Sequence, residues 1–169
     1  MLRLVCILAV AVLAITAANT LARDVVSIAG KEISKQEKFD VIFEDKAVGH
    51  MISFTQIRAK MHETKGDGLF EALNKTCSAT WDLTHGNGTA EGYCASEKNG
   101  DKIGIKWNGM CNSAAGTAKK PLLRCGGGWI FVEGTGTGRY AGVSGGGVWT
   151  GNFLPNGDFE EEWSGIYRK

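Results

Sequence analysis

One glycine-rich stretch of this chain distinguishes two fold classes: Val132-Glu-Gly-Thr-Gly-Thr-Gly-Arg-Tyr-Ala-Gly-Val-Ser-Gly-Gly-Gly147. It contains Gly136-x-Gly138-x-x-Ala141 directly after an apolar run, a spacing that resembles a dinucleotide-binding fingerprint. Such a site needs a helix right after the glycine turn, because the N–H groups at the helix N-terminus hold the pyrophosphate. Glycine occupies four of the six positions after Ala141, and each would cost a helix about 1 kcal/mol. We therefore expect no helix and no nucleotide site here, and we interpret the glycines as bends in the wall of a small β-barrel.

The rest of the chain alternates in the manner of antiparallel strands. In residues 76–83, Cys77, Ala79, Trp81 and Leu83 share one face and polar residues the other. Clusters of Gly, Asn and Asp near 85–88, 99–101 and 156–158 predict hairpin turns. The expected strands lie near 37–44, 49–60, 67–84 (broken near Asn74), 88–96, 101–109, 127–133, 146–154 and 158–168, and residues 112–120 are expected to form a mobile loop. About eight short strands must close or hide their edges, so we predict an all-β fold, as a closed antiparallel barrel rather than a sandwich.

The N-terminus predicts export. A charged start is followed by an apolar run from Leu4 to Ile15 and by small residues with possible cleavage points after Ala18 or Ala22. The run is short for a membrane span, so we interpret residues 1–22 as a signal peptide rather than as an uncleaved anchor. Residues 23–169 then form a single barrel domain, periplasmic or secreted.

Four cysteines remain after removal of the signal: Cys77, Cys94, Cys111 and Cys125. In an exported domain this number favours two disulfides, because oxidising compartments let such bonds persist. Three pairings are possible, and we favour Cys77–Cys94 and Cys111–Cys125, since each pair flanks one hairpin or loop. The cysteines contain no C-x-x-C pair and the three histidines are scattered, so no metal site is expected.

The C-terminal third resembles a known superfamily. The run Gly136-Thr-Gly-Arg-Tyr-Ala-Gly-Val-Ser-Gly145, between residues 129–132 and a final hairpin, is similar to the G-T-G-(aromatic)-x-x-x-x-G signature of allene oxide cyclase-like and dirigent-like barrels, especially small exported bacterial members of unassigned function. The resemblance implies an eight-stranded antiparallel barrel with an apolar, partly open interior, often a trimer. It carries over no catalytic residue.

Two glutamates are candidate catalytic groups. Strand alternation places Glu133 on one face with Trp129 and Phe131, and Glu161 on another with Phe159, Trp163 and Tyr167. If these faces line the interior, each carboxyl has a raised pKa and can serve as a general acid or base. In the alternative, both glutamates face water and the aromatic residues cover an oligomer interface.

A second set of residues is predicted to bind a ligand. His50 and Arg58 share one strand face, and we expect them either at the barrel mouth, holding an anionic group with Arg58 as a further catalytic candidate, or as ordinary solvated residues. The other predicted ligand contacts are Trp129, Phe131, Trp163 and Tyr167.

Three functions fit this sequence. The first is a non-enzymatic exported barrel that binds a small apolar or aromatic molecule in its interior or at its mouth. The alternatives are a lyase or isomerase of the cyclase or dirigent type, and a structural or assembly barrel with a filled interior. The net charge of +1 without a basic stripe indicates no nucleic acid, no membrane span is expected after the signal, and no cofactor is predicted.

Overall fold

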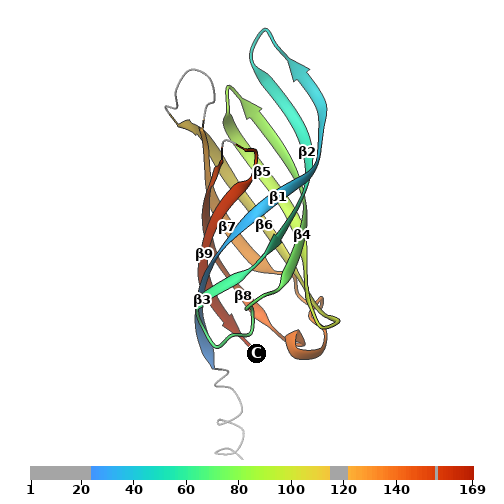
Figure 1. Cartoon of the computed structure of the whole chain (residues 1–169), viewed down its shortest axis with the longest axis vertical. Helices are drawn as coiled ribbons and strands as arrows, with labels where there is room; N and C mark the ends of the chain where they lie inside the picture. The colour runs from blue at the N-terminus through green and yellow to red at the C-terminus, as the bar shows by residue number, and fades with distance from the viewer. Residues whose placement is uncertain (1–23, 115–121, 155) are drawn as a thin grey trace, which may run out of the picture.

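The computed structural model describes residues 24–114, 122–154 and 156–169. The predicted signal peptide and most of the predicted loop at 112–120 lie outside these residues. The described chain is all-β (Figure 1), with nine strands and one short 3-10 turn: β1 (Val25–Asp45), β2 (His50–Lys60), β3 (His62–Lys65), β4 (Asn74–Thr84), β5 (Asn87–Lys98), β6 (Asp101–Ala114), β7 (Leu122–Phe131), η1 (Gly138–Tyr140), β8 (Ser144–Phe153) and β9 (Phe159–Arg168).

The strands form one antiparallel sheet that returns on itself. From β4 to β9 each strand pairs with the next along the chain, β2 pairs with β4, and β9 pairs with β1. The long strand β1 completes the ring, because Val25–Ser34 pair with β9 and the following residues, Lys35–Asp45, pair with β2. The ring therefore consists of eight strands, and the short β3 lies beside it against β1.

The prediction of an all-β antiparallel fold is confirmed, and several segment predictions are wrong. Residues 25–36 belong to β1, although no strand was expected there. Residues 66–73 form turns instead of the start of a strand, and residues 112–114 extend β6 instead of beginning a loop. Tertiary pairing decides these segments, because ring closure supplies strand partners that local alternation cannot reveal.

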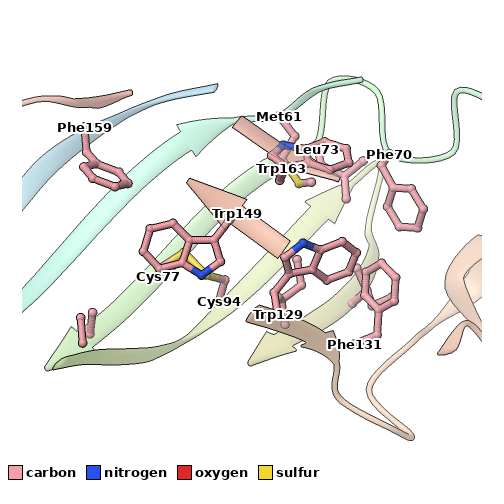
Figure 2. Packing of buried hydrophobic residues seen from close by; sticks show 14 of the residues in the cluster. Met61, Phe70, Leu73, Cys77, Cys94, Trp129, Phe131, Trp149, Phe159 and Trp163 are labelled. Atoms are coloured by element: carbon pink, nitrogen blue, oxygen red, sulfur yellow. A yellow bond between two sulfur atoms is a disulfide. The ribbon is translucent and has the colours of Figure 1, made fainter. Parts of the chain in front are cut away.

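The interior of the ring is built from tryptophans packed on glycines. All five tryptophans line it. A Cβ added to Gly92 would lie 2.8 Å from the Trp107 indole, and one added to Gly165 would lie 2.8 Å from that of Trp129. These glycines thus leave space for an indole to lie against a neighbouring strand, a known way to stabilise glycine in a sheet. Figure 2 shows Trp129, Trp149 and Trp163 among the buried hydrophobic residues.

The glycine-rich stretch closes one end of the ring. The three-residue turn η1 is the only helical element there, and β8 begins at Ser144, so the expected absence of a helix is confirmed. Tyr140 is fully buried, stacks with Phe70 and donates a hydrogen bond to the Leu69 carbonyl (3.2 Å). The Thr135 hydroxyl accepts from the Gly104 N–H (2.9 Å), which ties the stretch to β6.

Both predicted disulfides are present. Cys77–Cys94 joins β4 to β5 and Cys111–Cys125 joins β6 to β7, each between residues directly opposite one another. All four side chains are buried, which places the bridges on the inner face of the ring. Two such disulfides indicate an oxidising environment. Among the described residues, no helix has the length and apolar character to cross a bilayer.

Candidate ligand-binding site

Within the described part of the chain, the ring surrounds an apolar cavity. Five tryptophans and four phenylalanines line it, together with the polar residues Ser34, Gln36, Thr55, Lys75 and Glu161. Gly157, an exposed residue of the turn between β8 and β9, also lines it, so the cavity reaches the surface at this end. Figure 2 shows Trp149, Phe159 and the Cys77–Cys94 bridge in this packing.

The cavity is small. Its volume is about 50 Å³, which is room for roughly four water molecules. Typical ligand pockets reach several hundred Å³. A cavity that takes up one benzene ring is about three times larger, about 150 Å³. A ligand as large as one ring therefore has to extend through the open end beside Gly157 or displace the walls.

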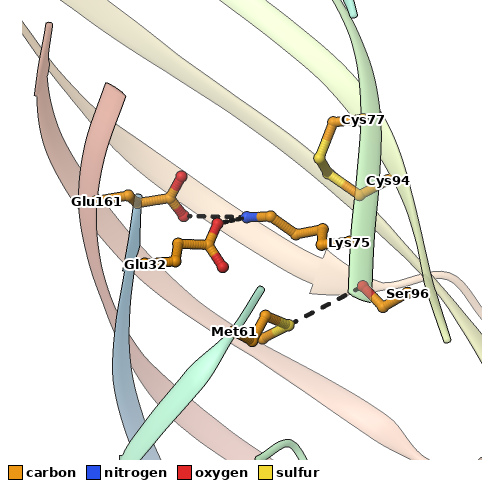
Figure 3. Close-up of a disulfide and its surroundings, with 7 residues drawn as sticks. All are labelled: Glu32, Met61, Lys75, Cys77, Cys94, Ser96 and Glu161. Carbon is orange, nitrogen blue, oxygen red and sulfur yellow. Dashed lines mark hydrogen bonds and ion pairs between the residues drawn. A yellow bond between two sulfur atoms is a disulfide. The ribbon is translucent and has the colours of Figure 1, made fainter. Parts of the chain in front are cut away.

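A charged cluster lies at the cavity wall: Lys75 and Glu161 line the cavity, and the fully buried Glu32 pairs with Lys75. Lys75 on β4 reaches Glu32 on β1 and Glu161 on β9; its Nζ contacts Glu32 Oε1 and lies 3.6 Å from Glu161 Oε1 (Figure 3). The two glutamates are directly opposite one another in the β1–β9 ladder. The Glu32 side chain is fully buried, and those of Lys75 and Glu161 are 8% and 14% exposed. Two carboxylates and one ammonium are thus enclosed by an apolar wall.

Burial and the charge of the ion-pair partner shift the pKa of Glu161, and likewise that of Lys75, in opposite directions. Burial raises the pKa of Glu161 to about 7, although the positive charge of Lys75 acts against this shift and the charge of Glu32 adds to it. Burial alone would lower the pKa of Lys75, but the charges of Glu161 and Glu32 outweigh it, so the pKa is raised and the ammonium stays charged. The cluster therefore gains or loses a proton near neutral pH.

Several buried polar atoms beside this cluster have no partner. Glu32 Oε2, Ser34 Oγ and Trp163 Nε1 make no hydrogen bond to any described residue, nor does the more distant Ser53 Oγ. Ser34 and Trp163 line the cavity. Buried polar groups are nearly always paired in proteins, so these atoms indicate a site that a bound molecule or water completes.

The structure brings together five of the predicted site residues. Trp129, Phe131, Trp163 and Tyr167 are buried inside the ring, and Glu161 lies among them on the inner wall. Tyr167 does not line the cavity; it packs against Phe70 and donates a hydrogen bond to Asp67.

Three other candidate residues do not lie on the inner wall, and their positions agree with the alternative in which these side chains are solvated. Glu133 is exposed and follows the end of β7, because the strand stops at Phe131 before its alternation reaches this residue. Arg58 is on the outer face, 67% exposed and paired with Glu37 (3.0 Å). His50 is also on the outer side of β2, where it bonds Asp82 (2.7 Å).

Sequence reasoning missed Glu32 and Lys75. A signal for Lys75 was present, because it shares the alternation phase of Cys77, Ala79 and Trp81 on the buried face of β4. Glu32 carried no comparable signal, since residues 25–36 were not recognised as a strand.

No known protein-family model matches this chain, and no curated protein matches it significantly. Within the described residues, no group of three His, Cys, Asp or Glu side chains is arranged to hold a metal ion.

Proposed function

We propose that the ring is a closed β-barrel of an exported protein, and that this barrel binds a small apolar or aromatic molecule in its interior. The observation that supports this most is the charged cluster at the aromatic cavity, in which Lys75 and Glu161 line the cavity and Lys75 also pairs with the buried Glu32. Burying such charges costs several kcal/mol per ion before their attraction is counted, and apolar residues of similar volume often stabilise a protein more. A purely structural core gains little from this arrangement, whereas a binding site needs polar groups to orient its ligand.

The resemblance of residues 136–145 to allene oxide cyclase-like and dirigent-like barrels agrees with this proposal. Eight antiparallel strands in a ring and an aromatic residue packed in the glycine-rich stretch are features that the resemblance implies. The two disulfides agree with export to the periplasm or medium, where such bonds form.

Native mass spectrometry of the protein purified from its own compartment tests the proposal, because a retained molecule adds its mass to the intact chain. A matched pair of variants locates that molecule. Ile57 lines the cavity, so Ile57→Phe fills it, whereas Ile42 is 64% exposed and Ile42→Phe leaves the cavity unchanged. We expect the added mass in the wild type and in Ile42→Phe and its loss in Ile57→Phe. An adduct that survives Ile57→Phe, or no adduct in any sample, would contradict binding in the interior.

An isomerase or lyase is the second candidate, and Glu161 is the observation that favours it. A carboxyl with a pKa near 7 beside an ammonium in a cavity can donate or accept a proton at neutral pH. The exposed Glu133 and Arg58 no longer support this activity. If the retained molecule is converted, Glu161→Gln should abolish turnover while the molecule still binds.

Self-association into a trimer belongs to the same proposal. Ile130, Gly146 and Ile166 lie side by side across β7, β8 and β9, and Val148 lies beside them. Ile130, Val148 and Ile166 are exposed, so this part of the outer surface is apolar and can pack against a second copy of the chain. Sedimentation of the wild type and Val148→Lys tests it: a trimer that the substitution dissociates is expected, and a wild-type monomer would contradict it.

A further inference from the structure

The charged cluster has more hydrogen-bond acceptors than donors. The carboxylates of Glu32 and Glu161 offer about eight lone-pair positions, against the three N–H donors of Lys75. Glu32 Oε2 is buried and has no partner among the described residues. The unpaired indole N–H of Trp163 adds only one donor. A ligand that satisfies this site must therefore bring hydrogen-bond donors.

The cluster also lacks positive charge. With both carboxyls ionised and Lys75 protonated, its net charge is −1 inside an apolar wall, which is costly. Glu161 faces Glu32 from β1 and Lys75 from β4, while its partner on β8 is Gly151, which brings no charge. Either a proton on Glu161 or a cation from outside neutralises the cluster.

The walls around Glu161 suit a cation. Phe159 and Trp163 flank it on the inner face of β9, and both line the cavity. The faces of aromatic rings attract an ammonium group, and more strongly when it is desolvated. A carboxylate ligand could pair with Lys75, but it would also meet two carboxylates that already share this ammonium.

We propose that the ligand is a small organic cation: a protonated primary amine whose ammonium group binds Glu161 beside the buried Glu32, while a hydrocarbon body of about one ring extends toward the open end of the cavity. This inference rests on the proposed binding function and specifies the class of ligand. On binding, the amine replaces the proton of Glu161, which passes to solvent, so the neutral cluster is exchanged for a neutral complex.

Three benzyl compounds of similar size test the inference: benzylamine, benzyl alcohol and benzoate. Titration calorimetry and the fluorescence of the cavity tryptophans report binding at pH 6 and pH 8. At pH 8 we expect benzylamine to bind at least about tenfold more tightly than benzyl alcohol, and benzoate to bind most weakly. The amine's affinity should rise about tenfold from pH 6 to pH 8, because the ionised fraction of Glu161 rises by that factor. The affinity of benzyl alcohol should change little.

Two variants separate this inference from a structural effect. Glu161→Gln should lower benzylamine affinity and remove its pH dependence, but preserve the binding of benzyl alcohol. Glu160→Gln, at the exposed neighbouring position, should behave as the wild type.

The outcomes also separate the inference from the proposed function. If benzoate binds best, or if benzylamine binding is independent of pH, the cationic ligand is wrong. In that case, the proposed binding in the interior is still supported if Ile57→Phe blocks binding of the benzyl compounds. If benzylamine does not bind at all, the inference also fails, and the retained molecule in native mass spectrometry alone decides the proposed function.

Discussion

The substitution Glu161→Gln should make the protein more stable at pH 8 than the wild type. Glu161 has an ordinary pKa of 4.5 when unfolded and a pKa of about 7 when folded. The folded state therefore holds this proton more tightly, and the stability that it contributes is fully present below pH 4.5 and lost as the pH rises through 7. The difference corresponds to about 3 kcal/mol. The variant, which does not titrate, should exceed the wild type by up to this amount at pH 8 and match it near pH 4.5.

Urea unfolding with the disulfides intact measures this difference. Wild type, Glu161→Gln and the control Glu160→Gln are unfolded at pH values from 4.5 to 8 and followed by tryptophan fluorescence, since the buried indoles become exposed on unfolding. The free-energy difference between wild type and Glu161→Gln should grow with pH, while the control follows the wild type. A difference that is constant over this range would refute the reasoning, because it would mean that Glu161 does not hold its proton in the folded state.

Three further substitutions and one control test the packing and the cluster. Gly109→Ala should lower the free energy of unfolding by about 1–3 kcal/mol, because a Cβ there would lie 2.5 Å from the Trp149 indole. In the control Gly128→Ala, the atom nearest to the added Cβ is 3.7 Å away, so stability should change by less than about 1 kcal/mol. Equal losses for both variants in urea unfolding would contradict the packing of the Trp149 indole against Gly109. Tyr140→Phe should cost about 1 kcal/mol in the same assay through loss of its buried hydrogen bond, and an unchanged midpoint would show that this bond adds nothing. Lys75→Met should cost about 3–5 kcal/mol at pH 8, because it leaves two facing carboxylates unpaired, and less at pH 5, where one of them can be protonated; a loss independent of pH would indicate a packing defect instead.

The candidate site was only partly predictable, and its residues show why. Alternation placed Glu161 and the aromatic residues Trp129, Phe131 and Trp163 on the faces of regular strands and left open whether these faces point inward; they lie inside the ring. Glu133 continues the same alternation in the sequence, but β7 ends two residues earlier, so the Glu133 side chain is exposed to water. The positions of strand ends depend on the neighbouring strand, which local periodicity does not include.

Strand β2 shows a second reason why the sequence alone could not place every site residue. His50 and Arg58 were correctly placed on one face, because alternation is a local property. Which face points inward depends on the partner strands β1 and β4, and here Ser53 and Thr55 are buried instead. Period-2 alternation relates residues to one another and does not assign either face to the interior when both carry polar and apolar residues.

The amino-acid sequence by itself determined the all-β class, the hairpin turns, the absence of a helix in the glycine-rich stretch and the pairing of the four cysteines. These features follow from the preferences of neighbouring residues: alternation, positive φ at glycine and short loops between bonded positions. Only the tertiary structure decided that Glu32, Lys75 and Glu161 meet. Their strands β1, β4 and β9 are distant in the chain, and closing the ring through β1 sets the register that brings the three charges together.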